Sequence, residues 1–239
     1  IALKIADHVI TESHYSKEKI VTLYQANPNK ITVIPNGIDE RFRPAPPGQC
    51  QEVIAKYNLP QKFILYLGAI EPKKNIDCLL DAVRIVGEKL DAVLLVIAGA
   101  RGSMPYNLDN AIRTRKLERK VRVIGYISEA DVVPLLSAAH IFIYPSLYEG
   151  FGFPPLEAMA CATPTIVSDS TSLPEIVGDG ALVVAAQDAG GFASAILKLW
   201  TDHLYHADFS AQGQQQASRF RWQPCIRQTL AIYQKVLSA

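Results

Sequence analysis

Residues 141–160 read IFIYPSLYEGFGFPPLEAMA and change character twice along their length. A short run of β-branched and aromatic residues comes first, and a loop rich in glycine and proline follows it. The last part is made of residues that favour a helix. An unbroken apolar run is typical of a strand in a parallel sheet that is covered on both faces. The stretch therefore predicts a buried strand over 141–144, a loop from Pro145 and a helix beyond the loop.

The same alternation of apolar runs and amphipathic segments extends to both sides of this stretch. Between the first two runs, Ile76, Leu79, Leu80 and Val83 have the spacing of one helix face. Such a pattern predicts an α/β fold with a doubly wound, Rossmann-like parallel sheet, which binds ligands beyond the carboxyl ends of its strands. Six strands are expected, over 63–67, 93–98, 121–124, 141–144, 165–168 and 181–184.

The chain outside this region predicts a smaller unit and a terminal helix. Short β-like runs at 8–10 and 30–35, with a helix over 16–24 capped by Ser16, indicate one βαβ unit. The turn at 36–37 and the proline-rich stretch 43–48 indicate a linker. We divide the chain into 1–44, an incomplete N-terminal domain; 45–208, the main domain; and 209–239, a terminal helix over 209–237. Because the pattern begins abruptly at Ile1, we expect a longer parent protein.

Composition excludes several classes of protein. The 239 residues are 49% hydrophobic and 20% charged, and 24 basic against 23 acidic residues give a net charge of +1. Without a basic run, nucleic acid is not expected as a partner. The cysteines are too widely spaced for a metal knuckle or a redox pair, which favours reduced thiols in the cytoplasm. The longest apolar stretch, 92–100, is far shorter than the roughly 20 residues of a membrane helix. Peripheral contact with the inner face of a membrane is left open.

The loop that follows 141–144 has the composition of an anion site. Gly150 and Gly152 allow close approach of a ligand to the backbone, and prolines preset the first turn of the next helix. The free amides at a helix start suit a diphosphate. The alternative is a tight turn in which Glu157 only complements the helix dipole and Glu149 is a solvated carboxylate. Spacing alone leaves the two interpretations level.

The loop after 63–67 places Lys73 and Lys74 just before a helix. Cations at this edge of the sheet suit a diphosphate leaving group, whose developing charge needs to be offset. Taken alone, two solvated lysines would be the preferred interpretation. The interpretation as solvated lysines is less favoured here, because two loops suited to anions are expected at the same edge of one sheet.

Other kinds of site lack their patterns. The chain has no P-loop, no third glycine after Gly150 and Gly152, and no Gly-x-Ser-x-Gly elbow. No aspartate pair is spaced as Asp-x-Asp, so no metal site is expected. His203 and His206 are expected at the surface rather than on a metal.

The pattern Pro-Ser-x-x-Glu-Gly-Phe-Gly-x-Pro-x-x-Glu-Ala-Met-Ala over 145–160 contains the Glu-x7-Glu motif at Glu149 and Glu157. In this it resembles the retaining glycosyltransferases of family 4 (glycosyl transferases group 1), and the loop over 66–75 looks like that of the mannosyltransferase-like members. These enzymes have the GT-B fold, with two facing nucleotide-binding-type domains. The segments 33–39, 66–75 and 172–178 are similar to the domain crossover, the phosphate loop and the segment after the next strand in that family.

The resemblance implies a role for each matching residue. Lys74, helped by Lys73, would neutralise the donor diphosphate, Glu157 would accept hydrogen bonds from the ribose, and Glu149 would contact the donor sugar. Catalytic roles are expected for Glu149 and Lys74. Many relatives carry an arginine soon after the first-loop glycine, where this chain has Ala69 and Ile70. Sugar and phosphate are expected to contact Gly68 and the amides of Gly150, Phe151, Gly152 and Phe153. The base is expected to lie near Tyr126 and Ile127.

The resemblance also implies an activity: transfer of a hexose, mannose from GDP-mannose in the first place, with retention of configuration and without a cofactor or a metal. The expected partners are the nucleotide-sugar donor, a glycan or lipid-linked acceptor, and the rest of the N-terminal domain. The 239 residues alone are expected to bind nucleotide but to transfer sugar poorly. The alternatives are a sugar-nucleotide epimerase, a phosphorylase of similar build, and a nucleotide-sugar-binding module that no longer catalyses transfer.

Overall fold

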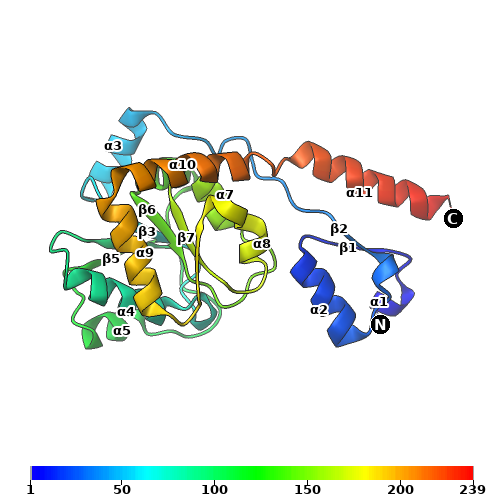
Figure 1. The fold of residues 1–239 in the computed structure, drawn as a ribbon, viewed down its shortest axis with the longest axis horizontal. Coiled ribbons are helices and arrows are strands. Elements are labelled where there is room, and N and C mark those ends of the chain that lie inside the picture. The colour runs from blue at the N-terminus through cyan, green and yellow to red at the C-terminus, as the bar shows by residue number, and fades with distance from the viewer. Residues whose placement is uncertain (1, 239) are drawn as a thin grey trace.

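The computed structural model describes residues 2–238, which form a large unit built on a six-stranded sheet and a small unit built on two strands (Figure 1). All neighbouring strands of the large sheet are parallel, in the order β5-β4-β3-β6-β7-β8. Its strands are β3 Ile64–Leu67, β4 Leu95–Ala98, β5 Val121–Gly125, β6 Ile141–Tyr144, β7 Thr165–Ser168 and β8 Leu182–Val184.

The strand order reverses at the pair formed by β3 and β6. From β3 the chain winds outward through β4 to β5, and from β6 it winds the other way through β7 to β8. The loops that follow β3 and β6 therefore start from the central pair of strands, and in doubly wound sheets the ligand-binding crevice lies at this point. The predicted doubly wound parallel sheet is confirmed.

Helices cover both faces of this sheet. One set of packed helices is α4 Ile76–Gly87 with α5 Leu108–Thr114 and α9 Ala189–Thr201. The other is α6 Glu129–Ala138 with α3 Pro47–Lys56 and α7 Phe153–Ala160, and α10 His203–Ala217 packs on α7. The short elements at the sheet edge are η2 Pro72–Lys74, α8 Leu173–Val177 and η3 Gly178–Gly180.

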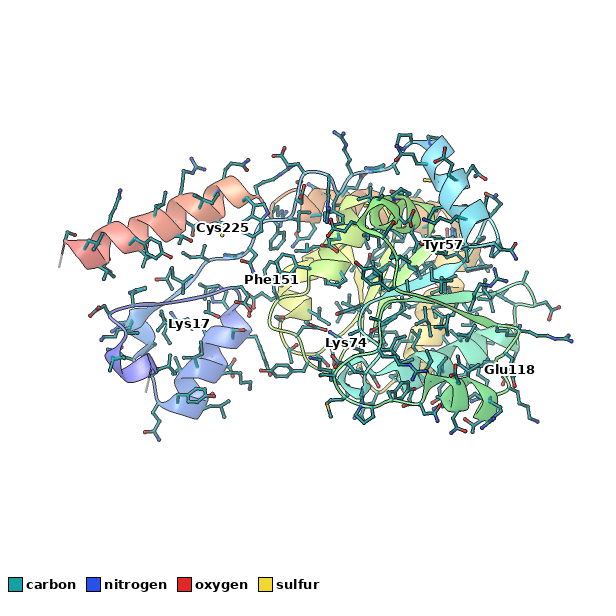
Figure 2. All side chains as sticks on the ribbon, turned by 180° about the vertical axis from the view of Figure 1, so that it is seen from behind. Lys17, Tyr57, Lys74, Glu118, Phe151 and Cys225 are labelled. Carbon is teal, nitrogen blue, oxygen red and sulfur yellow. The ribbon has the colours of Figure 1, made fainter. Side chains whose placement is uncertain are left out.

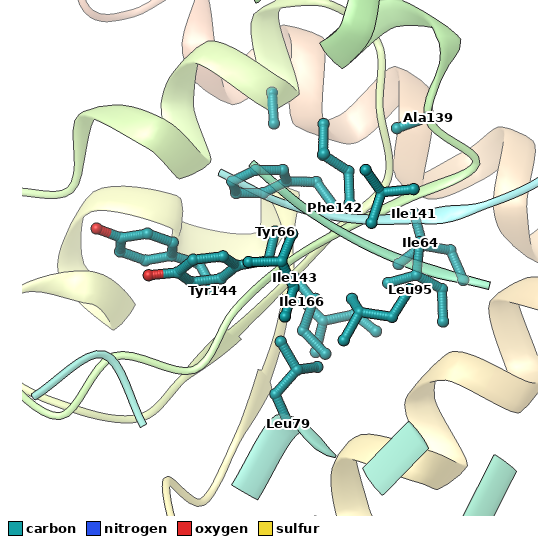
Figure 3. Packing of buried hydrophobic residues seen from close by; sticks show 14 of the residues in the cluster. Ile64, Tyr66, Leu79, Leu95, Ala139, Ile141, Phe142, Ile143, Tyr144 and Ile166 are labelled. Carbon is teal, nitrogen blue, oxygen red and sulfur yellow. The ribbon is translucent and has the colours of Figure 1, made fainter. Parts of the chain in front are cut away.

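The core is centred on the middle strands. Phe63, Ile64, Leu65 and Phe142 are wholly buried, and helix residues such as Leu79 pack against them (Figure 3). An aliphatic or aromatic side chain of this size contributes about 1.5–3 kcal/mol when it is fully buried. The sheet therefore forms a rigid base under the loops at its carboxyl edge.

The small unit begins the chain and contains one parallel pair. It consists of α1 Ala2–Ile5, β1 Val9–Thr11, α2 His14–Tyr24, η1 Pro28–Lys30 and β2 Ile31–Val33, with β1 and β2 paired in parallel. The βαβ unit is as predicted, but its helix begins earlier than expected. Ser13, not Ser16, is the N-cap, and its Oγ accepts a hydrogen bond from the amide of Ser16 at 3.1 Å.

The predicted single helix over 209–237 is wrong, because two helices occupy this region. Helix α10 ends at Ala217, and α11 Trp222–Leu237 begins after a break. Pro224 explains the break: in a continuous helix its ring would clash with the carbonyl of Phe220, four residues earlier. Instead, that carbonyl accepts a hydrogen bond from the amide of Ile38 at 3.2 Å.

The chain thus crosses between the two units twice, and the crossings touch. A Cβ added to Gly37 would lie 2.3 Å from the amide nitrogen of Trp222, so only glycine fits there. Helix α11 then runs out beside the small unit (Figure 1). Together with that unit it lines an apolar hollow of about 380 Å³ that includes Ile10 and Tyr233.

Two further expectations concern cysteines and membranes. The four cysteines are free thiols, of which Cys78 and Cys161 are buried. Among the helices of residues 2–238, none combines the length and the apolar character that a membrane crossing requires.

A histidine cluster lies at the amino end of β6, opposite the crevice. His140 stacks on His206 with ring centroids 4.1 Å apart and meets Trp200 edge-on at 5.2 Å. His206 was expected at the surface but is half-buried in this stack, whereas His203 is exposed. Burial, the nearby His206 and Lys62 lower the pKa of His140 to about 3. His140 is therefore neutral in the folded protein.

We predict that this cluster makes the fold sensitive to acid. His140 takes up a proton in the unfolded chain below about pH 6.5 but resists it when folded, so stability should fall as the pH drops from 6.5 towards 3. The free energy of unfolding should decrease by roughly 1–3 kcal/mol more between pH 7 and pH 4 in the native chain than in His140→Phe. Urea unfolding at both pH values checks this, and equal decreases in the two proteins would contradict it.

Candidate functional site

The Lys74 side chain lies buried at the reversal point of the sheet. Strand β3 ends at Leu67, and the turn η2 brings Lys74 back over the edge, where only 10% of its side chain is exposed. Its Nζ donates to Glu149 Oε1 at 2.6 Å and to the Tyr144 hydroxyl at 2.9 Å. Both partners come from β6 and its loop. The two loops predicted separately from the sequence therefore meet in one ion pair.

Main-chain contacts hold these two loops together. The amide of Leu147 donates to the carbonyl of Lys73 at 2.8 Å. The Asn75 side-chain amide donates to the carbonyls of Pro145, at 3.1 Å, and of Ala186, at 2.6 Å. The position of the Lys74–Glu149 pair is thus set by backbone as well as by side chains.

Two stacked tyrosines lie under the pair. The rings of Tyr66 and Tyr144 are nearly parallel, with centroids 6.0 Å apart, and their hydroxyls point the same way (Figure 3). The Tyr66 hydroxyl donates to the carbonyl of Ala69 at 2.7 Å, whereas the Tyr144 hydroxyl contacts Lys74. Burial and the charge of Glu149 raise the pKa of both phenols, so both remain neutral.

Serine hydroxyls hold the loop from Glu149 to Phe151 in place through its backbone carbonyl oxygens. Ser172 Oγ lies 3.0 Å from the carbonyl oxygen of Glu149 and 2.9 Å from that of Phe151. The Gly150 carbonyl between them accepts a hydrogen bond from Ser13 Oγ of the small unit at 2.8 Å. Figure 2 shows Phe151 on the side of the large unit that faces the small one.

The backbone amides that follow Glu149 in this segment make no hydrogen bond within the described chain. Those of Gly150, Phe151, Gly152 and Phe153 find no acceptor within residues 2–238. Gly152 has a φ of 117°, a left-handed conformation that favours glycine, and is the N-cap of α7. A run of free amides at the start of a helix, beside a buried lysine, can bind an anion.

Glu157 lies on α7 and faces the linker between the units. It is half-buried, and burial raises its pKa to about 7, an effect that the Arg41 guanidinium opposes and Asp39 reinforces. Arg41 also forms an ion pair with Glu129, at the start of α6, at 3.0 Å. Glu157 is thus a carboxylate that a hydrogen-bond donor would help to ionise.

Lys73, the second predicted lysine, points elsewhere. Its Nζ lies 3.1 Å from Glu71 Oε1, and about half of its side chain is exposed. Glu71 itself is buried and lies against Gly102, where a Cβ would come within 2.7 Å of its side chain. Lys73 is therefore near the edge but is paired to a buried carboxylate.

The predicted base-binding residues lie at one end of the same edge. Tyr126 and Ile127 follow β5, the edge strand, and Tyr126 is 77% exposed while Ile127 is buried. Strand β5 is two strands away from β3, which is about 10 Å at the usual spacing. Gly68 directly follows β3, and its amide donates to the carbonyl of Ala98 at 3.0 Å.

Sequence reasoning missed several residues of this arrangement. Tyr144 could have been noticed, because it is a hydroxyl at the end of a central apolar strand. Ser13, Ser172 and Thr171 carry no such signal, because their contacts arise from tertiary packing. Thr171 Oγ1, for example, accepts a hydrogen bond from the amide of Glu149 at 3.0 Å. No group of three or more metal-ligating side chains in residues 2–238 is arranged to hold a metal ion.

Known families match two parts of the chain. The sequence pattern of the family described as glycosyl transferases group 1 matches residues 51–216, and that of glycosyltransferase family 4 matches residues 1–42. The O-antigen chain mannosyltransferase B of Escherichia coli is 35% identical over 234 residues, which are 97% of this chain and 61% of that protein. The chain thus spans less than two thirds of that relative.

Solved structures have the same fold. Sucrose-phosphate synthase from Thermosynechococcus elongatus superposes with a TM-score of 0.85 at 25% identity, over 99% of this chain and 60% of that one. Anabaena Alr3699/HepE in complex with UDP and glucose gives 0.89 at 20% identity, over 98% of this chain and 65% of that one. The predicted GT-B type of fold is confirmed.

We predict that Lys74 and Glu149 depend on each other for stability. Because both side chains are largely buried, Lys74→Met leaves a carboxylate without its cation and should lower the free energy of unfolding by roughly 2–4 kcal/mol. Glu149→Gln added to Lys74→Met should restore more than half of the loss. Urea denaturation of the native chain, both single variants and the double variant measures the coupling. Additive losses would contradict the pairing.

Proposed function

Because the chain belongs to the family of glycosyl transferases group 1, we propose that it binds the nucleotide-diphosphate sugar of a hexosyl transfer. The observation that carries the proposal is the meeting of the β3 and β6 loops at the reversal point of the sheet. There the buried Lys74 ammonium pairs with Glu149, and the amides of the four residues after Glu149 have no acceptor within residues 2–238. Cation and amides together suit a diphosphate, whose charge rises as the glycosidic bond breaks.

We assign the other groups by the resemblance to the family. Glu149, at the crevice and 2.6 Å from Lys74, would accept hydrogen bonds from sugar hydroxyls, and Glu157 would accept them from the ribose. The amides of Gly150, Phe151, Gly152 and Phe153 would hold sugar and phosphate, with Lys73 and Gly68 at the border. Tyr126 and Ile127 would flank the base. Mannose as the sugar and GDP as its carrier are proposed from the similarity to a mannosyltransferase.

Transfer itself would proceed with retention and without a metal or a cofactor, on this proposal. Lys74 and the amides would stabilise the leaving diphosphate in place of a divalent cation. The acceptor is proposed to be a glycan or a lipid-linked glycan, consistent with the naming of the Escherichia coli relative as an O-antigen enzyme. We propose that the chain works at the cytoplasmic side of a membrane.

Nucleotide binding tests the proposal directly. The native chain should bind one of GDP, UDP, ADP and dTDP, with GDP expected, and excess EDTA should leave the affinity unchanged. Isothermal titration calorimetry with each nucleotide, with and without EDTA, gives the answer. Binding of none of the four would overturn the proposed function, and loss of binding on chelation would overturn its metal-free form.

Glu149 and Glu157 should differ in what they recognise. Glu149→Gln should weaken GDP-mannose more than GDP, because it removes an acceptor for the sugar. Glu157→Gln should weaken both ligands alike, by about 1–3 kcal/mol. Calorimetry with the two ligands measures this, and circular dichroism verifies that each variant is folded. Equal losses for both ligands in Glu149→Gln would contradict its assigned role.

Glu157 should also make binding depend on pH. With a pKa of about 7, it is charged at pH 8 and largely protonated at pH 6, while ribose hydroxyls bind the charged form. Affinity for GDP should therefore fall by about ten-fold from pH 8 to pH 6 beyond the change seen in Glu157→Gln. That variant supplies the baseline, because the terminal phosphate titrates in the same range. Parallel pH profiles would contradict the role of Glu157.

A further inference from the structure

Three successive carbonyl oxygens of the loop from Glu149 to Phe151 lie within hydrogen-bond distance of serine hydroxyls, which come from both units of the chain. Ser172, which precedes α8 in the large unit, contacts the first and the third. Ser13 of the small unit contacts the second, that of Gly150. The central peptide of the proposed donor loop thus takes its hydrogen-bond partner from the other unit.

The direction of this carbonyl decides the direction of an amide. In a trans peptide the C=O of one residue and the N–H of the next point opposite ways. When the Gly150 carbonyl points to Ser13, the N–H of Phe151 points away from the small unit. That N–H belongs to the run of amides without acceptors.

Ser13 is built into the boundary between the units. It is wholly buried, and its Oγ accepts from the Ser16 amide at 3.1 Å while donating to Gly150. The Ser16 hydroxyl lies 2.9 Å from Ser13 Oγ and 3.4 Å from the Gly150 carbonyl oxygen. A second contact is independent of the loop: the Glu175 carboxylate accepts from the amides of His14, at 2.8 Å, and Tyr15, at 3.2 Å.

We propose that Ser13 is a positioning residue for donor binding, which fixes the Gly150–Phe151 peptide so that its N–H faces the diphosphate. The inference rests on the proposed function. It makes the donor site a property of both units: the amides are fully oriented only while α2 is seated against the loop. Without the Ser13 hydroxyl the peptide is free to rotate. Part of the binding free energy is then spent on ordering it when the ligand binds.

The competing interpretation is that Ser13 only caps α2. Substitutions separate the two roles. Glycine is a tolerated N-cap that costs a few tenths of a kcal/mol but has no hydroxyl, while threonine keeps both the cap and the hydroxyl. Ser13→Gly therefore removes the contact with Gly150 at little expense to the helix, and Ser13→Thr is the conservative comparison. Glu175→Ala is the matched control, because it weakens the same boundary without touching a loop carbonyl.

The measurement is the ratio of affinities for a nucleoside diphosphate and its monophosphate, GDP and GMP in the expected case, by calorimetry on the whole chain. This ratio reports the distal phosphate and does not change if the fold is merely weakened. Ser13→Gly should lower it about five- to twenty-fold, the range for a charge-assisted hydrogen bond that is partly lost. Ser13→Thr and Glu175→Ala should keep the native ratio, the latter with a lower melting temperature.

The outcomes distinguish this inference from the proposed function. If the native chain binds no nucleoside diphosphate, both the proposed function and the positioning role of Ser13 are overturned. If the native chain binds but Ser13→Gly keeps the native ratio, only the positioning role is overturned. An equal fall of the ratio in Ser13→Gly and Glu175→Ala would likewise overturn it, because the boundary as a whole and not the hydroxyl would then be responsible.

Discussion

Strands β3 and β6 pair in parallel at the centre of the sheet, with Ile64 beside Ile141 and Leu65 beside Phe142. They are distant in the sequence, because 76 residues lie between Ile64 and Ile141 and two other strands come between them. The chain leaves these two strands in opposite directions, so the loops that follow them meet over the central pair. The two loops therefore form hydrogen bonds with each other, through the Lys73 carbonyl, the Asn75 side-chain amide and the Lys74 ammonium. The contacts between the two loops depend on this register, because it sets where β3 and β6 end relative to each other.

The electrostatics of the crevice follow from burial. Lys74 and Glu149 neutralise one another at 2.6 Å, so neither charge is left alone in a poorly solvated place. Glu157 has no such partner, and burial holds its pKa near 7. A ligand that brings hydroxyl donors to Glu157 would favour its ionised form, and an anion would share the Lys74 ammonium with Glu149. The carboxyl that burial disfavours in the free fold is thus the one that a bound hydroxyl donor would stabilise.

The sequence predicted the sheet and its two loops well, because strands buried on both faces leave long apolar runs and because Gly152 and the prolines mark a constrained turn. It did not predict where α2 begins or that the chain breaks at 218–221. Apolar spacing at 222, 226, 230 and 233 indicated a helix, but the position of Pro224 relative to Phe220 decides where that helix can begin. Ser13 and Ser172 act through contacts with residues far apart from them in the chain, which local patterns do not encode.

The two crossings between the units, the linker after β2 and the segment 218–221, touch at Gly37 and share the hydrogen bond from Ile38 to Phe220. The small unit is thus joined to the large one by two backbone crossings that meet, and not by a single linker. The contacts of Ser13 with Gly150 and of Glu175 with His14 and Tyr15 join the same two units at residues far from both crossings in the sequence. The donor loop is therefore attached to the small unit both through the covalent chain and through side-chain contacts that are separate from it.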